Sequence, residues 1–196
     1  MTGIILAGGK ALRMGGADKA FLEIDDEPII KRQLRCLKRI FKEIIIVTNS
    51  VKEYKHLRGV RVVSDVLPDR GPLGGIYSGL LASKSSHNFI AACDMPFLSF
   101  ALIKYIVASS DAYDIIIPKI KKKFHPLFGV YSKNCIPAIE EALKRDRLKV
   151  AGIFSKVKVR FLSQREIKGF DKNMLSLLNI NTPDELQRVK LGEDRI

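Results

Sequence analysis

The sequence predicts an α/β fold with a doubly wound, mostly parallel sheet, and two observations carry that prediction. Residues 4–6, 44–47 and 89–93 are continuous apolar runs, typical of strands that are buried on both faces of a parallel sheet. Residues 29–41 lie between the first two runs and repeat their apolar positions at helical spacing, which makes a strand-helix-strand unit. At 196 residues, the length suits one such domain, and we expect a single domain over residues 1–196.

A glycine-rich loop follows the first strand directly. Its two glycine pairs, Gly8-Gly9 and Gly15-Gly16, let backbone N–H groups approach an anion. The loop also carries three cations: Lys10, Arg13 and Lys19. Its spacing matches neither the G-x-G-x-x-G pattern nor a Walker motif. From composition alone, a phosphate-binding loop and a plain solvated turn remain equally good interpretations.

An acidic residue directly follows the predicted strand at residues 89–93. Asp94 follows this strand at the edge where open α/β sheets hold their ligands, and Pro96 fixes the chain after it. Ser99 is the better cap for the helix over residues 101–108, which leaves Asp94 available for chemistry.

Two further segments leave alternatives open. Residues 67–75 read as a Gly- and Pro-rich loop, and the small residues at the start of the helix behind it admit either a ligand or a neighbouring strand. Residues 113–117 and 124–131 read as two strands joined by a lysine-rich hairpin tip, which predicts one antiparallel pairing. For the lysines of that tip, a solvated edge is favoured over a substrate role.

The composition narrows the function classes. A net charge of +13 indicates an anionic partner: nucleic acid, a membrane surface or a phosphorylated small molecule. Aromatic residues make up only 8% of the chain and no nucleic-acid-binding signature is visible, so we expect no nucleic acid partner. No apolar run is long enough to span a bilayer and no signal peptide precedes the first strand, so we expect a cytoplasmic protein that does not bind membranes.

The cysteines do not indicate a disulfide framework or a nucleophile. Cys36, Cys93 and Cys135 lie far apart in the chain, and we expect three free thiols. Cys93 has no neighbouring histidine, so we interpret it as small buried filler.

The opening loop resembles that of a known family. The string Leu-Ala-Gly-Gly, Arg-Met-Gly and Asp-Lys over residues 6–19 resembles the signature loop of sugar-phosphate and cofactor nucleotidyltransferases, and most of all the molybdenum cofactor guanylyltransferases. Matching segments follow in family order: Asp65, residues 71–75, residues 93–96 and residues 179–183. The resemblance implies a Rossmann-like, doubly wound sheet of nucleotidyltransferase type.

The resemblance also implies roles for individual residues. Those placed on the guanine nucleotide are Leu6, Ala7, Gly8, Arg13, Gly16, Lys19, Asn49 and Asp65. Asp94 would hold Mg²⁺, and Asn179 and Asn181 would lie near the acceptor. Catalysis would rest on Arg13, Lys19 and Asp94. His125 and the lysines at 121–123 form a basic hairpin that we expect near the acceptor on charge and position alone.

The implied reaction joins two phosphates. The terminal phosphate of molybdenum-loaded molybdopterin attacks the α-phosphate of GTP, which gives the guanine dinucleotide cofactor and pyrophosphate. Molybdenum-insertion proteins and molybdoenzyme chaperones are further candidate partners, and we expect a monomer.

Two rival functions stay open. A related transferase would use CTP with molybdopterin, or a sugar or polyol phosphate, but such relatives more often have Ala-Ala-Gly where this chain has Ala7-Gly8-Gly9, which favours GTP. The second rival is a nucleotide- or nucleic-acid-binding regulator. Asp65 and Asp94 count against it, because carboxylates repel an anion unless a metal intervenes.

Overall fold

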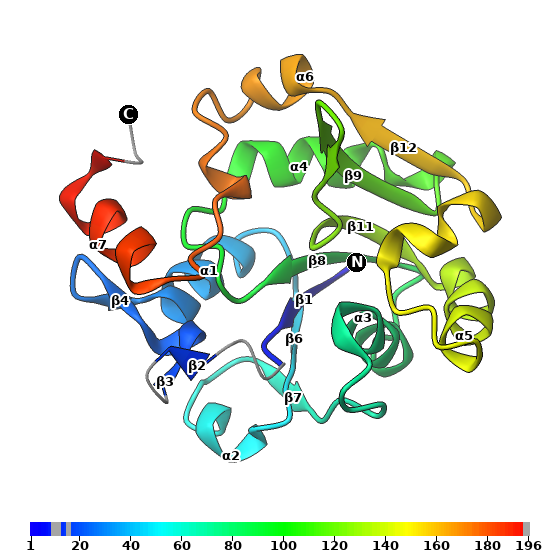
Figure 1. Cartoon of the computed structure of the whole chain (residues 1–196), viewed down its shortest axis with the longest axis horizontal. Coiled ribbons are helices and arrows are strands. Elements are labelled where there is room, and N and C mark those ends of the chain that lie inside the picture. Colours follow the sequence, from blue (N-terminus) through cyan, green and yellow to red (C-terminus); the bar gives the residue numbers. More distant parts are fainter. Residues whose placement is uncertain (9–12, 15–16, 194–196) are drawn as a thin grey trace.

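The computed structural model describes residues 1–8, 13–14 and 17–193 and has a twisted sheet at its centre (Figure 1). Four strands run parallel in the order β7, β6, β1, β8. Their bounds are Thr2–Leu6 for β1, Glu43–Val47 for β6, Arg61–Val63 for β7 and His87–Ala92 for β8. Ile4 of β1 pairs with Ile45 on one side and Ile90 on the other, and all three are fully buried. The predicted parallel core is therefore confirmed.

An antiparallel strand extends the sheet beyond β8. β11 (Phe128–Ser132) runs antiparallel to both β8 and β9 (Ile115–Ile120), and β12 (Val159–Leu162) then runs parallel to β9. The predicted strand at 124–131 is split, because β10 (Lys123–Phe124) pairs with β9 in a register different from that of β11. The mostly parallel sheet with an inserted antiparallel strand is thus confirmed.

Helices cover both faces of the sheet (Figure 1). One face packs against α1 (Ile29–Leu37), α4 (Phe100–Ala108) and α6 (Gln164–Lys168), and the other against α3 (Gly71–Ala82) and α5 (Ile136–Lys144). Side chains of β1 alternate between these layers, with Ile5 in the first and Ile4 in the second. None of the helices in the described ranges is long and apolar enough to cross a membrane.

Small elements surround the carboxyl edge of the parallel strands. They are β2 (Arg13–Met14), β3 (Ala17–Asp18), a 3₁₀ turn at Lys19–Phe21, β4 (Glu23–Ile24), β5 (Glu27–Pro28), α2 (Val51–Tyr54) and α7 (Pro183–Leu191). Further 3₁₀ turns span Ser110–Ala112, Lys133–Cys135, Val150–Lys156 and Leu175–Leu177. The predicted capping box of α7 is confirmed, since Thr182 and Glu185 each bond to the other's backbone N–H.

The interpretation of residues 67–75 as a loop was wrong in part. Residues 71–75 form the first turns of α3, because Pro72 suits a helix start and the glycines let the helix pack closely on β1. A Cβ at Gly79 would lie 2.8 Å from the Ile4 Cγ2 atom, and one at Gly75 would lie 3.5 Å from the Leu6 Cδ2 atom. Between the two alternatives for these glycines, the contacts favour strand packing.

Candidate active site

Three segments distant in sequence meet at the carboxyl edge of β1 and β8. The Cys93 N–H donates to the carbonyl oxygen of Leu6 at 3.0 Å, and the Ile180 N–H donates to that of Asp94, also at 3.0 Å. The opening strand, the turn after β8 and the chain before α7 are therefore tied together by backbone hydrogen bonds. This junction brings the predicted site residues of all three segments to one place.

Asp94 lies at this junction as a nearly buried carboxylate. Its side chain accepts a hydrogen bond at Oδ1 from Asn179 Nδ2 at 2.7 Å, and the residue is 8% exposed. Burial raises the pKa of Asp94, while the Asn179 hydrogen bond and the Lys19 charge lower it in part. A further cation at this carboxylate would favour its ionised form.

Lys19 brings a buried cation to the same junction. Its Nζ donates to Asn181 Oδ1 at 3.1 Å, and the residue is only 3% exposed. The two tail asparagines thus bind one group each, Asn179 the carboxylate and Asn181 the ammonium. The Glu185 carboxylate fixes this tail, since its Oε2 accepts from the Asn181 N–H at 2.6 Å.

Asp18 and Tyr54 hold the turn that carries Lys19 in place. Asp18 belongs to the matching motif, where the sequence indicates no role for it, and sequence reasoning missed Tyr54. Asp18 Oδ1 caps the 3₁₀ turn by accepting from the Ala20 N–H at 3.0 Å, while Oδ2 accepts from the Tyr54 hydroxyl at 2.6 Å. Tyr54 is fully buried, with its ring 4.9 Å from that of Phe21. No local sequence pattern predicts this contact, because it joins positions 36 residues apart.

Gln33 supports the turn that carries Asp94 and was also missed. Its Nε2 donates to the carbonyl oxygens of Ala92 at 2.7 Å and Met95 at 2.8 Å, and the side chain is fully buried. In the sequence it is simply one polar residue on an amphipathic helix. Cys93 between these carbonyls is fully buried, and burial raises the pKa of its thiol well above the usual value, which confirms the filler interpretation.

The predicted nucleoside residues lie at the ends of β6 and β7. Asn49 is exposed just after β6, whereas Asp65 is half-buried after β7. Asp65 Oδ1 accepts from Ser78 Oγ at 2.6 Å and from the Leu67 N–H at 3.0 Å, so its carboxylate is held by α3 and its own loop. Within the described ranges, no side-chain hydrogen bond links Asn49 or Asp65 to Lys19 or Asp94.

The other predicted nucleotide residues surround the end of β1. Leu6 and Ala7 are buried there and Gly8 is exposed. The Ala7 N–H donates to the Val47 carbonyl oxygen at 2.8 Å, which closes the β1–β6 pair. The Arg13 side chain and Gly16 lie outside the described residues, although the backbone of Arg13 pairs with Asp18.

The donor set at Asp94 fits a magnesium ion that arrives with phosphates. The described residues contain no group of three or more His, Cys, Asp or Glu side chains arranged to hold a metal. Mg²⁺ is usually bound by one or two carboxylates together with water and substrate phosphates, rather than by a cage of protein ligands. A single buried carboxylate beside a predicted phosphate loop agrees with that pattern.

The chain is similar to several proteins along its whole length. The probable molybdenum cofactor guanylyltransferase of Pelotomaculum thermopropionicum is 38% identical over 97% of this chain and 92% of its own. The molybdenum cofactor guanylyltransferase of Desulfosudis oleivorans is 36% identical over 97% and 94%. The crystal structure of molybdopterin-guanine dinucleotide biosynthesis protein A from Archaeoglobus fulgidus shares the fold, with a TM-score of 0.84, 23% identity and 100% of both chains covered. Residues 3–158 match the family model of the MobA-like NTP transferase domain, and the chain belongs to that family.

Proposed function

We propose that the protein transfers GMP from GTP to molybdenum-loaded molybdopterin and releases pyrophosphate. The observation that carries this proposal is the junction of Lys19, Asp94 and the two tail asparagines at the carboxyl edge of the sheet. Relatives that match nearly the whole chain carry the name molybdenum cofactor guanylyltransferase, which supports the choice of substrates.

The chemistry needs no general base and no covalent intermediate. The attacking group is a phosphate oxygen that is already anionic at neutral pH. The site has to bring two anions together, align them and stabilise the charge that moves onto pyrophosphate. Lys19 can do this effectively because the residue is only 3% exposed, and water screens a buried charge only weakly.

Asp94 and Arg13 complete the proposed charge stabilisation. Asp94 would hold Mg²⁺, which supplies stabilisation of the charge on the transferring phosphates. Asn179 orients the Asp94 carboxylate through its 2.7 Å hydrogen bond, and Asn181 orients Lys19 from the same tail. Arg13 would contact the triphosphate together with the backbone of Gly16.

The nucleoside would lie along the ends of β1, β6 and β7. The backbone of Leu6, Ala7 and Gly8 can approach the nucleotide, and Asn49 and Asp65 can bind the base and the ribose. Asp65 is preorganised for this role by its hydrogen bonds from Ser78 and Leu67.

A pyrophosphate assay tests this function. The protein is incubated with Mg²⁺, molybdenum-loaded molybdopterin and each of GTP, CTP, ATP and UTP in turn. We expect rapid pyrophosphate release with GTP, its loss in excess EDTA, and its return when Mg²⁺ is restored. Release with CTP alone would show a cytidylyltransferase instead.

The setting of the reaction is proposed on the same basis. We propose a single-domain monomer that works in the cytoplasm without nucleic acid or membrane, next to molybdenum-insertion proteins and molybdoenzyme chaperones. Light scattering of the purified protein tests the monomer, since a mass of two chains would contradict it.

A further inference from the structure

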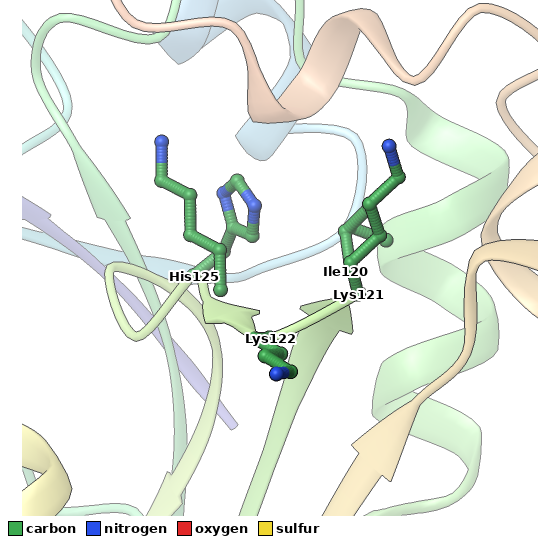
Figure 2. A pocket seen from close by; sticks show the side chains of 5 residues that line it. Ile120, Lys121, Lys122 and His125 are labelled. Carbon is green, nitrogen blue, oxygen red and sulfur yellow. The ribbon is translucent and has the colours of Figure 1, made fainter.

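A basic hairpin stands at the edge of the sheet, outside the group formed by Lys19 and Asp94. Ile120, Lys121, Lys122, Lys123 and His125 line a pocket of about 660 Å³ at the β9–β10 turn. Figure 2 shows Lys121 and His125 projecting from the same side of this hairpin. His125 is half-buried, and burial followed by the Lys123 charge lowers the pKa of its ring. Its imidazole can therefore donate a hydrogen bond without adding a positive charge at neutral pH.

The strand directions place this hairpin at the same edge of the sheet as Asp94. β8 and β9 run in the same direction on either side of β11, and Phe89 and Ile116 both pair with Val130. β8 ends at Ala92, just before the turn that holds Asp94, and β9 ends at Ile120, just before Lys121. Because β8 and β9 run in the same direction, Asp94 and Lys121 both follow strands at the carboxyl edge of the sheet. The pocket therefore lies at the same edge as the proposed reaction centre, on the other side of β11.

The turn between β9 and β10 carries three adjacent lysines, and its backbone is strained. Lys121 has a φ of 53°, in the left-handed region that favours glycine or asparagine. None of the ion pairs between described residues includes Lys121, Lys122 or Lys123. Three adjacent lysines repel one another, and a bound anion would relieve that repulsion.

We propose that Lys121, Lys123 and His125 bind a second anionic group of the acceptor. Resting on the proposed function, this inference assigns the terminal phosphate of molybdopterin to Lys19 and Asp94, and its oxo-molybdenum group to the hairpin. The phosphate and the oxo-molybdenum group lie at separate positions on the acceptor. The carboxyl edge of the sheet likewise carries cationic side chains at two separate positions, Lys19 at one and the hairpin lysines at the other. The hairpin then distinguishes loaded from metal-free molybdopterin.

Equilibrium binding of the two acceptor forms tests this assignment. In Lys121→Ala/Lys123→Ala, we expect the Kd of molybdenum-loaded molybdopterin to rise about tenfold or more, with less than a twofold change for metal-free molybdopterin and for GTP. The matched control is Lys42→Ala/Lys84→Ala, which removes two exposed lysines near the starts of β6 and β8, at the opposite edge. An unchanged Kd, an equal rise for both acceptor forms, or the same rise in the control would overturn the inference.

A second variant separates binding from folding. Lys121→Gly relieves the left-handed strain at φ 53° and removes one charge, so we expect a higher melting temperature together with weaker binding of the loaded acceptor. Loss of stability without loss of binding would contradict the assignment. Pyrophosphate release is measured in parallel: a wild-type protein without GTP-dependent release would overturn the proposed function itself, whereas an active wild type with unaffected hairpin variants overturns only this inference.

Discussion

The carboxyl edge of the sheet is built differently at its two ends. Beyond β1, β6 and β7 it offers backbone, a glycine, and the short side chains of Asn49 and Asp65, and α3 packs closely beneath through Gly75 and Gly79. Beyond β8 and β9 it carries the charged groups Asp94 and Lys121, with Lys19 bound to the tail beside Asp94. We call these the nucleotide half and the acceptor half.

The difference agrees with what the proposed function requires each half to bind. A nucleoside is large and carries little charge, so close packing of main chain and a few fixed acceptors can position it. Two phosphates that must meet repel each other, so the place where they react needs buried cations in fixed positions. We therefore expect shape changes to affect the nucleotide half most, and charge changes the acceptor half.

Removing the buried cation should have the largest effect. Lys19→Met keeps an apolar stem but loses the ammonium, so we expect pyrophosphate release to fall about a hundredfold or more. Steady-state assays check this, with the exposed Lys31→Met as the control for charge on the surface. Wild-type rates in Lys19→Met would contradict the phosphate assignment.

Crowding the contact between α3 and β1 should have the second largest effect. Gly79→Ala places a Cβ 2.8 Å from Ile4 Cγ2, so we expect a loss of about 1–3 kcal/mol in the free energy of unfolding and a higher KM for GTP. Denaturant unfolding measures the loss. Gly152→Ala is the matched control, because a Cβ there meets no atom within 4 Å. Equal stability of the two variants would show that α3 tolerates displacement from β1.

Removing the hydrogen bond to Asp94 should have a smaller effect. Asn179→Ala deletes the 2.7 Å contact, and we expect kcat/KM to fall about tenfold with more Mg²⁺ needed for half-maximal rate. Asn134→Ala removes a similar bond, 3.0 Å from Asn134 Nδ2 to Asp114 Oδ1, at an exposed position. If both variants kept wild-type magnesium dependence, Asn179 would not act through Asp94.

The hydrogen-bonded cluster around Glu166 lies outside both halves. We expect it to affect stability alone, with the smallest effect of the four changes. Burial raises the pKa of Glu166, but hydrogen bonds from Ser163, Arg160 and Tyr105 outweigh it and bring the value to about 2, below the ordinary 4.5. A lowered folded-state pKa gives stability that is present above pH 4.5 and is lost as the pH falls toward 2. We expect this loss to be on the order of 1 kcal/mol and absent in Glu166→Gln.

Unfolding curves recorded across that pH range check the prediction. The wild type and Glu166→Gln should have the same KM values for both substrates at neutral pH. Parallel loss of stability in both proteins on acidification would assign the effect to other groups.

The sequence predicted the elements that depend on local pattern. The buried strands, the Ser99 cap and the Thr182–Glu185 capping box follow from apolar runs and short-range polar signals, and all are present. Glycines misled the prediction at residues 71–75, since a helix that packs on a strand needs the same small residues as a loop. Tertiary contact decides between the two.

The contacts that support the site could not be predicted from the sequence, for the same reason. Gln33 and Tyr54 act on Asp94 and Lys19 through contacts between separate elements, and neither has a distinctive neighbourhood in sequence. The sequence favours a solvated edge for the hairpin lysines, because runs of charged residues usually form one. Only the strand pairing through β11 shows that Lys121 and Asp94 lie at the same edge of the sheet.

The division of the edge into two halves is tested most directly by KM values in one pair of variants. Asp65→Asn changes the nucleotide half, and Lys121→Ala/Lys123→Ala changes the acceptor half. We predict that the first raises the KM for GTP about tenfold and leaves the KM for the loaded acceptor within about twofold, while the second does the reverse. If both variants raised the same KM, the two halves would not bind separate substrates.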